Sequence, residues 1–140
     1  AHKLGSAYHI PHGRANAILL PYVIAYNAKK PIKFATWPKY EHFIADKRYA
    51  EIAEMLGLPC STTEEGVQSL IKAIIDLQNS MNVPRSIKSQ GIDEKTFMDN
   101  LDAVADEAHA DQCTPSNPRY PLISELKEIL VDAYHGPENK

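Results

Sequence analysis

Three histidines stand close together at the start of the 140-residue chain: His2, His9 and His12. An imidazole side chain can bind a metal ion through a neutral nitrogen, and it can also move a proton near neutral pH. Metal sites usually add a cysteine, a carboxylate or a further histidine at regular spacing, and this segment has no such partner. The spacing alone therefore favours surface or helix-capping histidines over metal ligands.

The segment that follows these histidines has to position them. Residues 15–26 are apolar at ten of twelve positions, which leaves no polar face for water and predicts a buried helix of about residues 13–27. This run is too short to cross a bilayer. Pro11 and Gly13 mark the start of the helix around His12, where the positive end of the helix dipole favours the neutral imidazole that binds metal.

The remaining long segments have helical rather than strand periodicity. Further helices are expected over about residues 40–56, 62–81, 93–108 and 124–136. Thr62, Asp93 and Ser124 are expected N-cap residues, and Gly57 is an expected C-terminal stop. One helical turn is expected over residues 86–90, and an irregular loop over residues 113–121. Trp37 is expected to be a packing anchor for the loop of residues 28–39. The chain is therefore predicted to be an all-α domain of about five helices.

Several stretches of the sequence resemble a known enzyme family. AHKLG, PHG and ANAILLP, which together fill most of residues 1–21, are similar to the metal-site signature of the iron-dependent (group III) alcohol dehydrogenases. KRYAEIAEMLGL and DEAHADQCTPSNPRYPLISELKEIL extend the resemblance over essentially the whole chain. It is strongest to the C-terminal part of the alcohol dehydrogenase half of bifunctional aldehyde-alcohol dehydrogenases.

The resemblance implies roles for three residues. His12, in PHG, matches a metal ligand of the family. His2, in AHKLG, matches the histidine beside the metal that lies near the nicotinamide and the substrate and transfers a proton. Cys113 matches a loop that lines the cofactor and substrate cleft, whereas His9 matches no histidine of the signature. The implied cofactors are Fe2+, or Zn2+, together with NAD.

The resemblance also implies that the chain is part of a longer enzyme. In the family, the signature begins one turn earlier with a further histidine, whereas this sequence starts at Ala1 in mid-motif and without an initiator methionine. We expect residues 1–140 to be a single helical domain that follows a nucleotide-binding domain, in an NAD-dependent enzyme that interconverts short-chain aldehydes and primary alcohols. The parent enzyme is expected to form a homo-oligomer, and the isolated chain to be inactive without bound metal or NAD.

Composition and charge are consistent with a soluble globular protein. The chain is 44% hydrophobic and 24% charged, which excludes the disordered class. A net charge of -3 provides no basic surface for nucleic acid or an anionic membrane, so neither is an expected partner. Cys60 and Cys113 are far apart and lack a C-x-x-C spacing, which indicates reduced thiols and a cytoplasmic location.

Three alternatives stay open at this point. The runner-up is a stand-alone helical module for packing or filament assembly, with no catalysis. A second is a zinc-using relative of the glycerol dehydrogenases, although the spacing from AHKLG to PHG fits the iron branch better. The third is nucleophilic catalysis by Cys113, which is the weakest because a single intracellular cysteine is usually an inert thiol.

Overall fold

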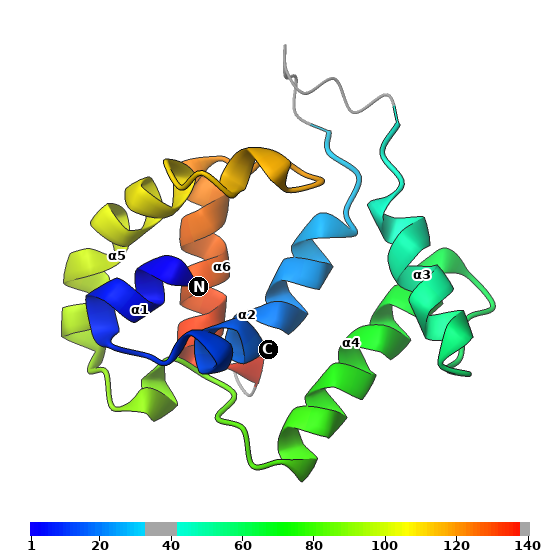
Figure 1. Cartoon of the computed structure of the whole chain (residues 1–140), viewed down its shortest axis with the longest axis horizontal. Coiled ribbons are helices and arrows are strands. Elements are labelled where there is room, and N and C mark those ends of the chain that lie inside the picture. Colours follow the sequence, from blue (N-terminus) through cyan, green and yellow to red (C-terminus); the bar gives the residue numbers. More distant parts are fainter. Residues whose placement is uncertain (33–41, 138–140) are drawn as a thin grey trace.

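The computed structural model describes residues 1–32 and 42–137, and in this part of the chain every regular element is helical (Figure 1). The elements are α1 (His2–Tyr8), α2 (His12–Asn27), α3 (Ala45–Met55), α4 (Thr63–Ser80), the short 3-10 helix η1 (Lys88–Gln90), α5 (Glu94–His109), the 3-10 helix η2 (Thr114–Ser116) and α6 (Ile123–His135). The all-α prediction is thus confirmed. None of these helices has the length and apolar character needed to span a membrane.

The central helix of the fold is α2, which packs against α1, α3, α4 and α6 (Figure 1). Its buried side chains serve two separate apolar clusters. Ile18 and Leu19 belong to a larger cluster with residues of α1, α5 and α6, whereas Ile24 packs with Ala53 and Val67 of α3 and α4. The predicted burial of this helix is therefore explained by contacts on several sides, because a helix without a polar face needs apolar partners around it.

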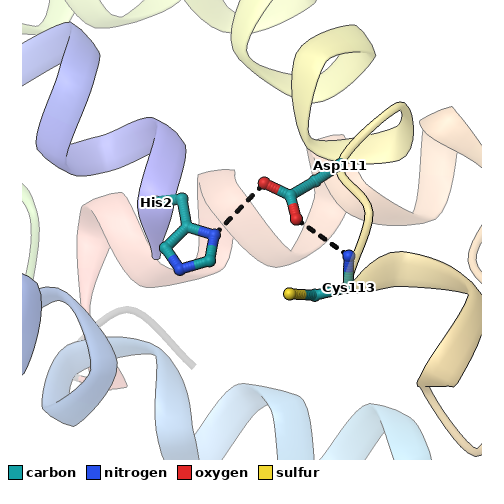
Figure 2. A group of neighbouring side chains, drawn as sticks. All are labelled: His2, Asp111 and Cys113. Carbon is teal, nitrogen blue, oxygen red and sulfur yellow. Dashed lines mark hydrogen bonds and ion pairs between the residues drawn. The ribbon is translucent and has the colours of Figure 1, made fainter.

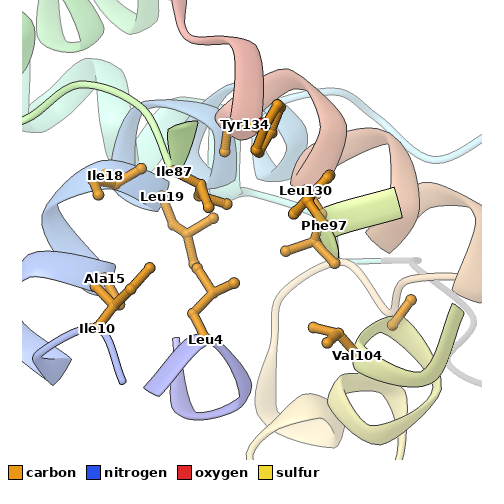
Figure 3. Close-up of a cluster of buried hydrophobic side chains, with 12 residues drawn as sticks. Leu4, Ile10, Ala15, Ile18, Leu19, Ile87, Phe97, Val104, Leu130 and Tyr134 are labelled. Atoms are coloured by element: carbon orange, nitrogen blue, oxygen red, sulfur yellow. The ribbon is translucent and has the colours of Figure 1, made fainter. Parts of the chain in front are cut away.

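The larger cluster includes two aromatic side chains, Phe97 of α5 and Tyr134 of α6 (Figure 3). The rings of Phe97 and Tyr134 stack with centroids 4.3 Å apart, and the Tyr134 hydroxyl donates a 3.0 Å hydrogen bond to the carbonyl of Ile92. Both side chains are almost fully buried. Each ring thus contributes a large apolar area, while the one polar atom of Tyr134 keeps a partner inside the core.

One helix was not expected from the sequence. Residues 2–8 form α1, so the structure has six α-helices in its described residues where about five were predicted. Ala1, Leu4 and Tyr8 all face the larger cluster, at the spacing of one helix face. The helix ends at His9, whose backbone is left-handed with a φ of 55°. Seven residues without a side-chain cap give too weak a signal for a sequence pattern to identify.

Most predicted boundaries are confirmed to within a few residues. Thr62 and Asp93 are N-cap residues, and each side chain accepts a hydrogen bond from the backbone N–H three residues later. Gly57 is left-handed at the end of α3, with a φ of 69°. The helix predicted from residue 40 begins at Ala45, and residues 33–41, which include Trp37, lie outside the described part of the chain.

The predicted cap of the last helix was wrong. α6 begins one residue earlier, after Leu122, and Ser124 lies inside its first turn. The Glu125 carboxylate accepts a 2.7 Å hydrogen bond from the backbone N–H of Leu122 and so takes the capping role. The preceding loop, predicted to be irregular throughout, contains the turn η2 at Thr114–Ser116.

Candidate active site

The starts of α1 and α2 bring two of the three N-terminal histidines together. His2 is the first residue of α1 and His12 the first residue of α2, and the chain reverses between them at the left-handed His9 and the N-cap Pro11. The two imidazole rings stack with their centroids 5.0 Å apart and their planes 18° from parallel. His9 is exposed and does not line the cavity described below.

His2 also contacts the loop after α5. Its Nδ1 lies 3.2 Å from Oδ2 of Asp111, and Oδ1 of Asp111 accepts a 3.0 Å hydrogen bond from the backbone N–H of Cys113 (Figure 2). These hydrogen bonds, first that from the Cys113 backbone and then that from His2, lower the pKa of Asp111 to about 2. Asp111 was not among the site residues predicted from the sequence. Its only local signal is its place two residues before Cys113, which suits an Asp side chain that closes a turn.

These residues border a cavity of about 370 Å³. His2, His12, Asn16, Asp111 and Cys113 supply polar groups to its wall, while Val23 and Ile129 supply apolar surface. A mostly apolar cavity with a few convergent polar groups is the usual form of a small-molecule site. The three residues singled out from the sequence, His2, His12 and Cys113, therefore lie on one cavity.

A network of buried and half-buried polar groups lies beside this cavity. Asn27 of α2 and Asn117 of the loop exchange amide hydrogen bonds of 2.8 and 3.2 Å. Two residues further on, Arg119 pairs with Glu125 of α6 at 2.8 Å and lies over the ring of Tyr26, with its Cζ 4.0 Å from the ring centroid. The loop that carries Asp111 and Cys113 is thus tied to both α2 and α6.

Comparison with known proteins identifies the family. A sequence model described as "Fe-containing alcohol dehydrogenase family, C-terminal" matches residues 1–134. The chain belongs to the iron-containing alcohol dehydrogenase family. The match spans both histidines on the cavity and the loop that carries Cys113.

Known proteins are similar in sequence to this chain over almost its whole length. An aldehyde-alcohol dehydrogenase of Streptococcus pneumoniae (strain TIGR4) is 51% identical over 97% of the chain, and a bifunctional aldehyde-alcohol dehydrogenase of Escherichia coli (strain K12) is 48% identical over 97%. The structure of an iron-containing alcohol dehydrogenase from Thermococcus thioreducens matches 96% of the chain with a TM-score of 0.74 and 31% identity. The chain spans 15% and 16% of the first two proteins and 30% of the third.

The metal implied by this iron-containing family can be tested against the side chains on the cavity. Imidazole nitrogen is a ligand that suits iron and zinc, and His12 presents one at the cavity wall, where Nε2 lies 3.0 Å from the amide nitrogen of Asn16. The described residues place no second and third candidate ligand together with His12. One group of three candidate ligands occurs in them, His2, Asp111 and Cys113, with one ligand atom from each within 4.8 Å of the others. The chemistry of His12 thus fits one position of a metal site.

Proposed function

We propose that the chain is the C-terminal, metal-side helical domain of an NAD-dependent, iron-dependent alcohol dehydrogenase that interconverts short-chain aldehydes and primary alcohols. The observation that carries this proposal is the stacked pair of His2 and His12 at the edge of the cavity, in a chain of the iron-containing family. The cavity volume of about 370 Å³ is sufficient for a small aldehyde or alcohol.

In this proposal the two histidines have different roles. His12 is one metal ligand, because its imidazole lies on the cavity and is not taken up by a carboxylate. His2 receives the hydroxyl proton of the alcohol during oxidation and returns it during reduction, because its ring lies beside His12 and a second partner holds one of its nitrogens. Cys113 also lines the cavity, and we assign it to the part of the wall that would face the cofactor. When bound, a divalent metal supplies Lewis acidity at the substrate oxygen and NAD accepts the hydride.

We assign the other groups needed for this activity to a different domain of the enzyme. A catalytic metal site typically has about three protein ligands, and among the described residues no group of three candidate ligands includes His12. We therefore assign residues 1–140 to one helical domain and the remaining ligands and the NAD site to a preceding nucleotide-binding domain. Fe2+ is the metal that we propose, and Zn2+ is the alternative that the same imidazole would accept.

The enzyme is proposed to act in the cytoplasm as a homo-oligomer. Both cysteines are free thiols, which suits a reducing compartment. Several large apolar side chains are exposed on the helical domain, among them Met55 at 86% and Leu56 at 62% of their accessible surface. Such residues are candidates for contacts with a second copy of the chain or with the nucleotide-binding domain.

The test is metal analysis beside steady-state kinetics in the full-length enzyme that contains this chain. His12→Ala is expected to lose bound metal and turnover together, because it removes a ligand. His2→Ala is expected to keep its metal and to lower kcat by a factor on the order of 10² to 10⁴, the usual contribution of general acid-base catalysis. His9→Asn is the matched control, since His9 belongs to the same segment but is exposed and does not line the cavity, and asparagine tolerates its left-handed backbone.

Two results would contradict these assignments. Equal metal loss in the His2 and His12 variants would make His2 a ligand rather than a proton carrier. Normal metal content and turnover in His12→Ala would remove the metal role of that residue altogether. A separate measurement addresses the domain assignment: the purified 140-residue chain is expected to bind no NADH and to reduce no aldehyde, so measurable turnover by the chain would refute it.

A further inference from the structure

The carboxylate of Asp111 joins two elements that are 109 residues apart in the chain. One oxygen contacts Nδ1 of His2 at the start of α1, and the other accepts the backbone N–H of Cys113 in the loop after α5 (Figure 2). The side chain of Asp111 is 15% exposed, whereas that of His2 is 54% exposed. Asp111, the more buried of the two partners, is therefore placed to hold the imidazole of His2.

We propose that Asp111 is a positioning residue for His2, which fixes its ring orientation and its tautomer. An ionised carboxylate can only accept hydrogen bonds, so the nitrogen that faces it must carry the hydrogen. With Nδ1 protonated, the lone pair of neutral His2 is on Nε2, on the side of the ring away from Asp111 (Figure 2). This inference rests on the proposed function, in which that lone pair receives the proton of the substrate hydroxyl.

Further observations indicate that Asp111 is ionised and that its carboxylate and the ring of His2 are held in one orientation. The pKa of Asp111, lowered to about 2, keeps the group ionised and therefore an acceptor at any pH at which the enzyme would act. The hydrogen bond from Cys113 occupies Oδ1, so Oδ2 is directed at His2. On its other face the ring of His2 stacks on that of His12. Together these contacts define the plane and the direction of the imidazole.

A purely structural role for Asp111 would make a different prediction for Asp111→Asn. The asparagine carbonyl can still accept the Cys113 N–H and keep the turn closed. Its amide group, now facing His2, is a donor and selects the tautomer that has the lone pair on Nδ1 and the hydrogen on Nε2. If Asp111 only closes the turn, this variant should behave as the wild type. If Asp111 positions His2, then in Asp111→Asn the Nε2 atom of His2 carries a hydrogen and cannot accept the proton of the substrate hydroxyl.

The first experiment compares kcat, KM and metal content in the full-length enzyme with Asp111→Asn, His2→Ala and the double variant. Asp111→Asn is expected to lower kcat by a factor on the order of 10², with KM and metal content close to the wild type. Because Asp111 acts through His2, the double variant is expected to be no slower than His2→Ala alone. Asp106→Asn is the control: it makes the same charge change at an exposed position on α5.

A second readout does not depend on turnover. Diethyl pyrocarbonate acylates an imidazole nitrogen that has a free lone pair, and tryptic cleavage after Lys3 separates His2 from His9 and His12. In the metal-free full-length enzyme, the Asp111→Asn variant is expected to be acylated at His2 several-fold more slowly than the wild type and the Asp106→Asn control.

Wild-type kcat in Asp111→Asn, beside a lowered kcat in His2→Ala, would overturn the proposal. Losses in the two single variants that multiply in the double variant would also overturn it, because Asp111 would then act independently of His2. An unchanged rate of acylation at His2 in Asp111→Asn would also overturn it. The proposed function fails in a different way: His2→Ala then keeps wild-type kcat, while slower acylation in Asp111→Asn still supports the positioning of His2 by Asp111.

Discussion

The side chain of Gln78 donates a 2.6 Å hydrogen bond to the carbonyl of Ala17, which joins α4 to the middle of α2. In an α-helix the carbonyl of Ala17 would normally accept a hydrogen bond from the backbone N–H of residue 21. Residue 21 is Pro21, which has no N–H. Gln78 is only 6% exposed. The buried glutamine therefore supplies the donor that proline removes from the interior of the central helix.

Gln78→Met is expected to destabilise the chain, because methionine fills a similar volume but leaves the Ala17 carbonyl unpaired inside the protein. The expected loss is about 1–3 kcal/mol in the free energy of unfolding. In a Pro21→Ala background, the new N–H can bond to Ala17, so the same substitution should cost less. Urea unfolding followed by circular dichroism measures all four variants of this cycle, and an equal cost in both backgrounds would contradict the explanation.

A second prediction concerns the close approach of α3 and α4. A Cβ atom added at Gly66 would lie 2.5 Å from Sγ of Cys60 and 3.0 Å from Cα of Ala50. Gly66→Ala is therefore expected to force the two helices apart, at a cost of about 1–3 kcal/mol in the free energy of unfolding. Thermal unfolding of the variant measures this loss.

Gly13→Ala is the matched control for that measurement. Gly13 is also helical, in the first turn of α2, but a Cβ added there has no neighbour within 4 Å. Because alanine has the higher helix propensity, this variant should be as stable as the wild type or up to about 1 kcal/mol more stable. If both variants lost the same stability, crowding at Gly66 would not be the cause.

The sequence predicted α3 to α6 because each buries one face at a regular spacing, and it predicted α2 from an almost continuous apolar run. The caps Thr62 and Asp93 are equally local, since each side chain bonds the backbone three residues later. Ser124 failed as a cap for a reason that is not local: Glu125 caps α6 while it also pairs with Arg119 in the preceding loop. A serine at a plausible position does not reveal that competition.

The candidate site was predictable only in part. His2 and His12 could be identified from a sequence signature, and they do lie together. Asp111 could not, because its contact with His2 spans 109 residues and depends on how α1 and α5 pack. Periodicity reports which face of a helix is buried, and it does not report which loop will lie beside the helix start.

The low pKa of Asp111 leads to a prediction for the pH dependence of stability. Its folded pKa of about 2 lies below the ordinary value of 3.8, so its contribution to stability is fully present above about pH 4 and is lost as the pH falls through about 2. Asp111→Ala should therefore be less stable than the wild type at pH 6, and the difference should shrink steadily between pH 4 and pH 2. Asp106→Ala, at an exposed position without a side-chain partner among the described residues, should show little difference at pH 6. A gap between Asp111→Ala and the wild type that stays constant down to pH 2 would show that the carboxylate charge does not stabilise the fold.

The last prediction tests how Arg119 holds the loop that carries Asp111 and Cys113. The guanidinium of Arg119 donates to the carbonyl of Tyr26 at 3.0 Å and to Glu125 at 2.8 Å, and it lies over the Tyr26 ring, with the side chain only 13% exposed. A lysine keeps the charge but cannot make these planar contacts together. Arg119→Lys is expected to lose about 1–3 kcal/mol in the free energy of unfolding.

The same variant should loosen the loop before it affects the rest of the fold. Backbone amides of the turn, such as that of Thr114, which donates to the Asp111 carbonyl at 3.0 Å, should exchange hydrogen for deuterium faster, while amides in α4 keep their protection. Arg48→Lys is the control, because Arg48 is 66% exposed and its pair with Glu51 is worth at most about 0.5 kcal/mol. Unchanged exchange around Thr114 in Arg119→Lys would mean that Asn117 and its partner Asn27 hold the loop without Arg119, since those two residues exchange amide hydrogen bonds of their own.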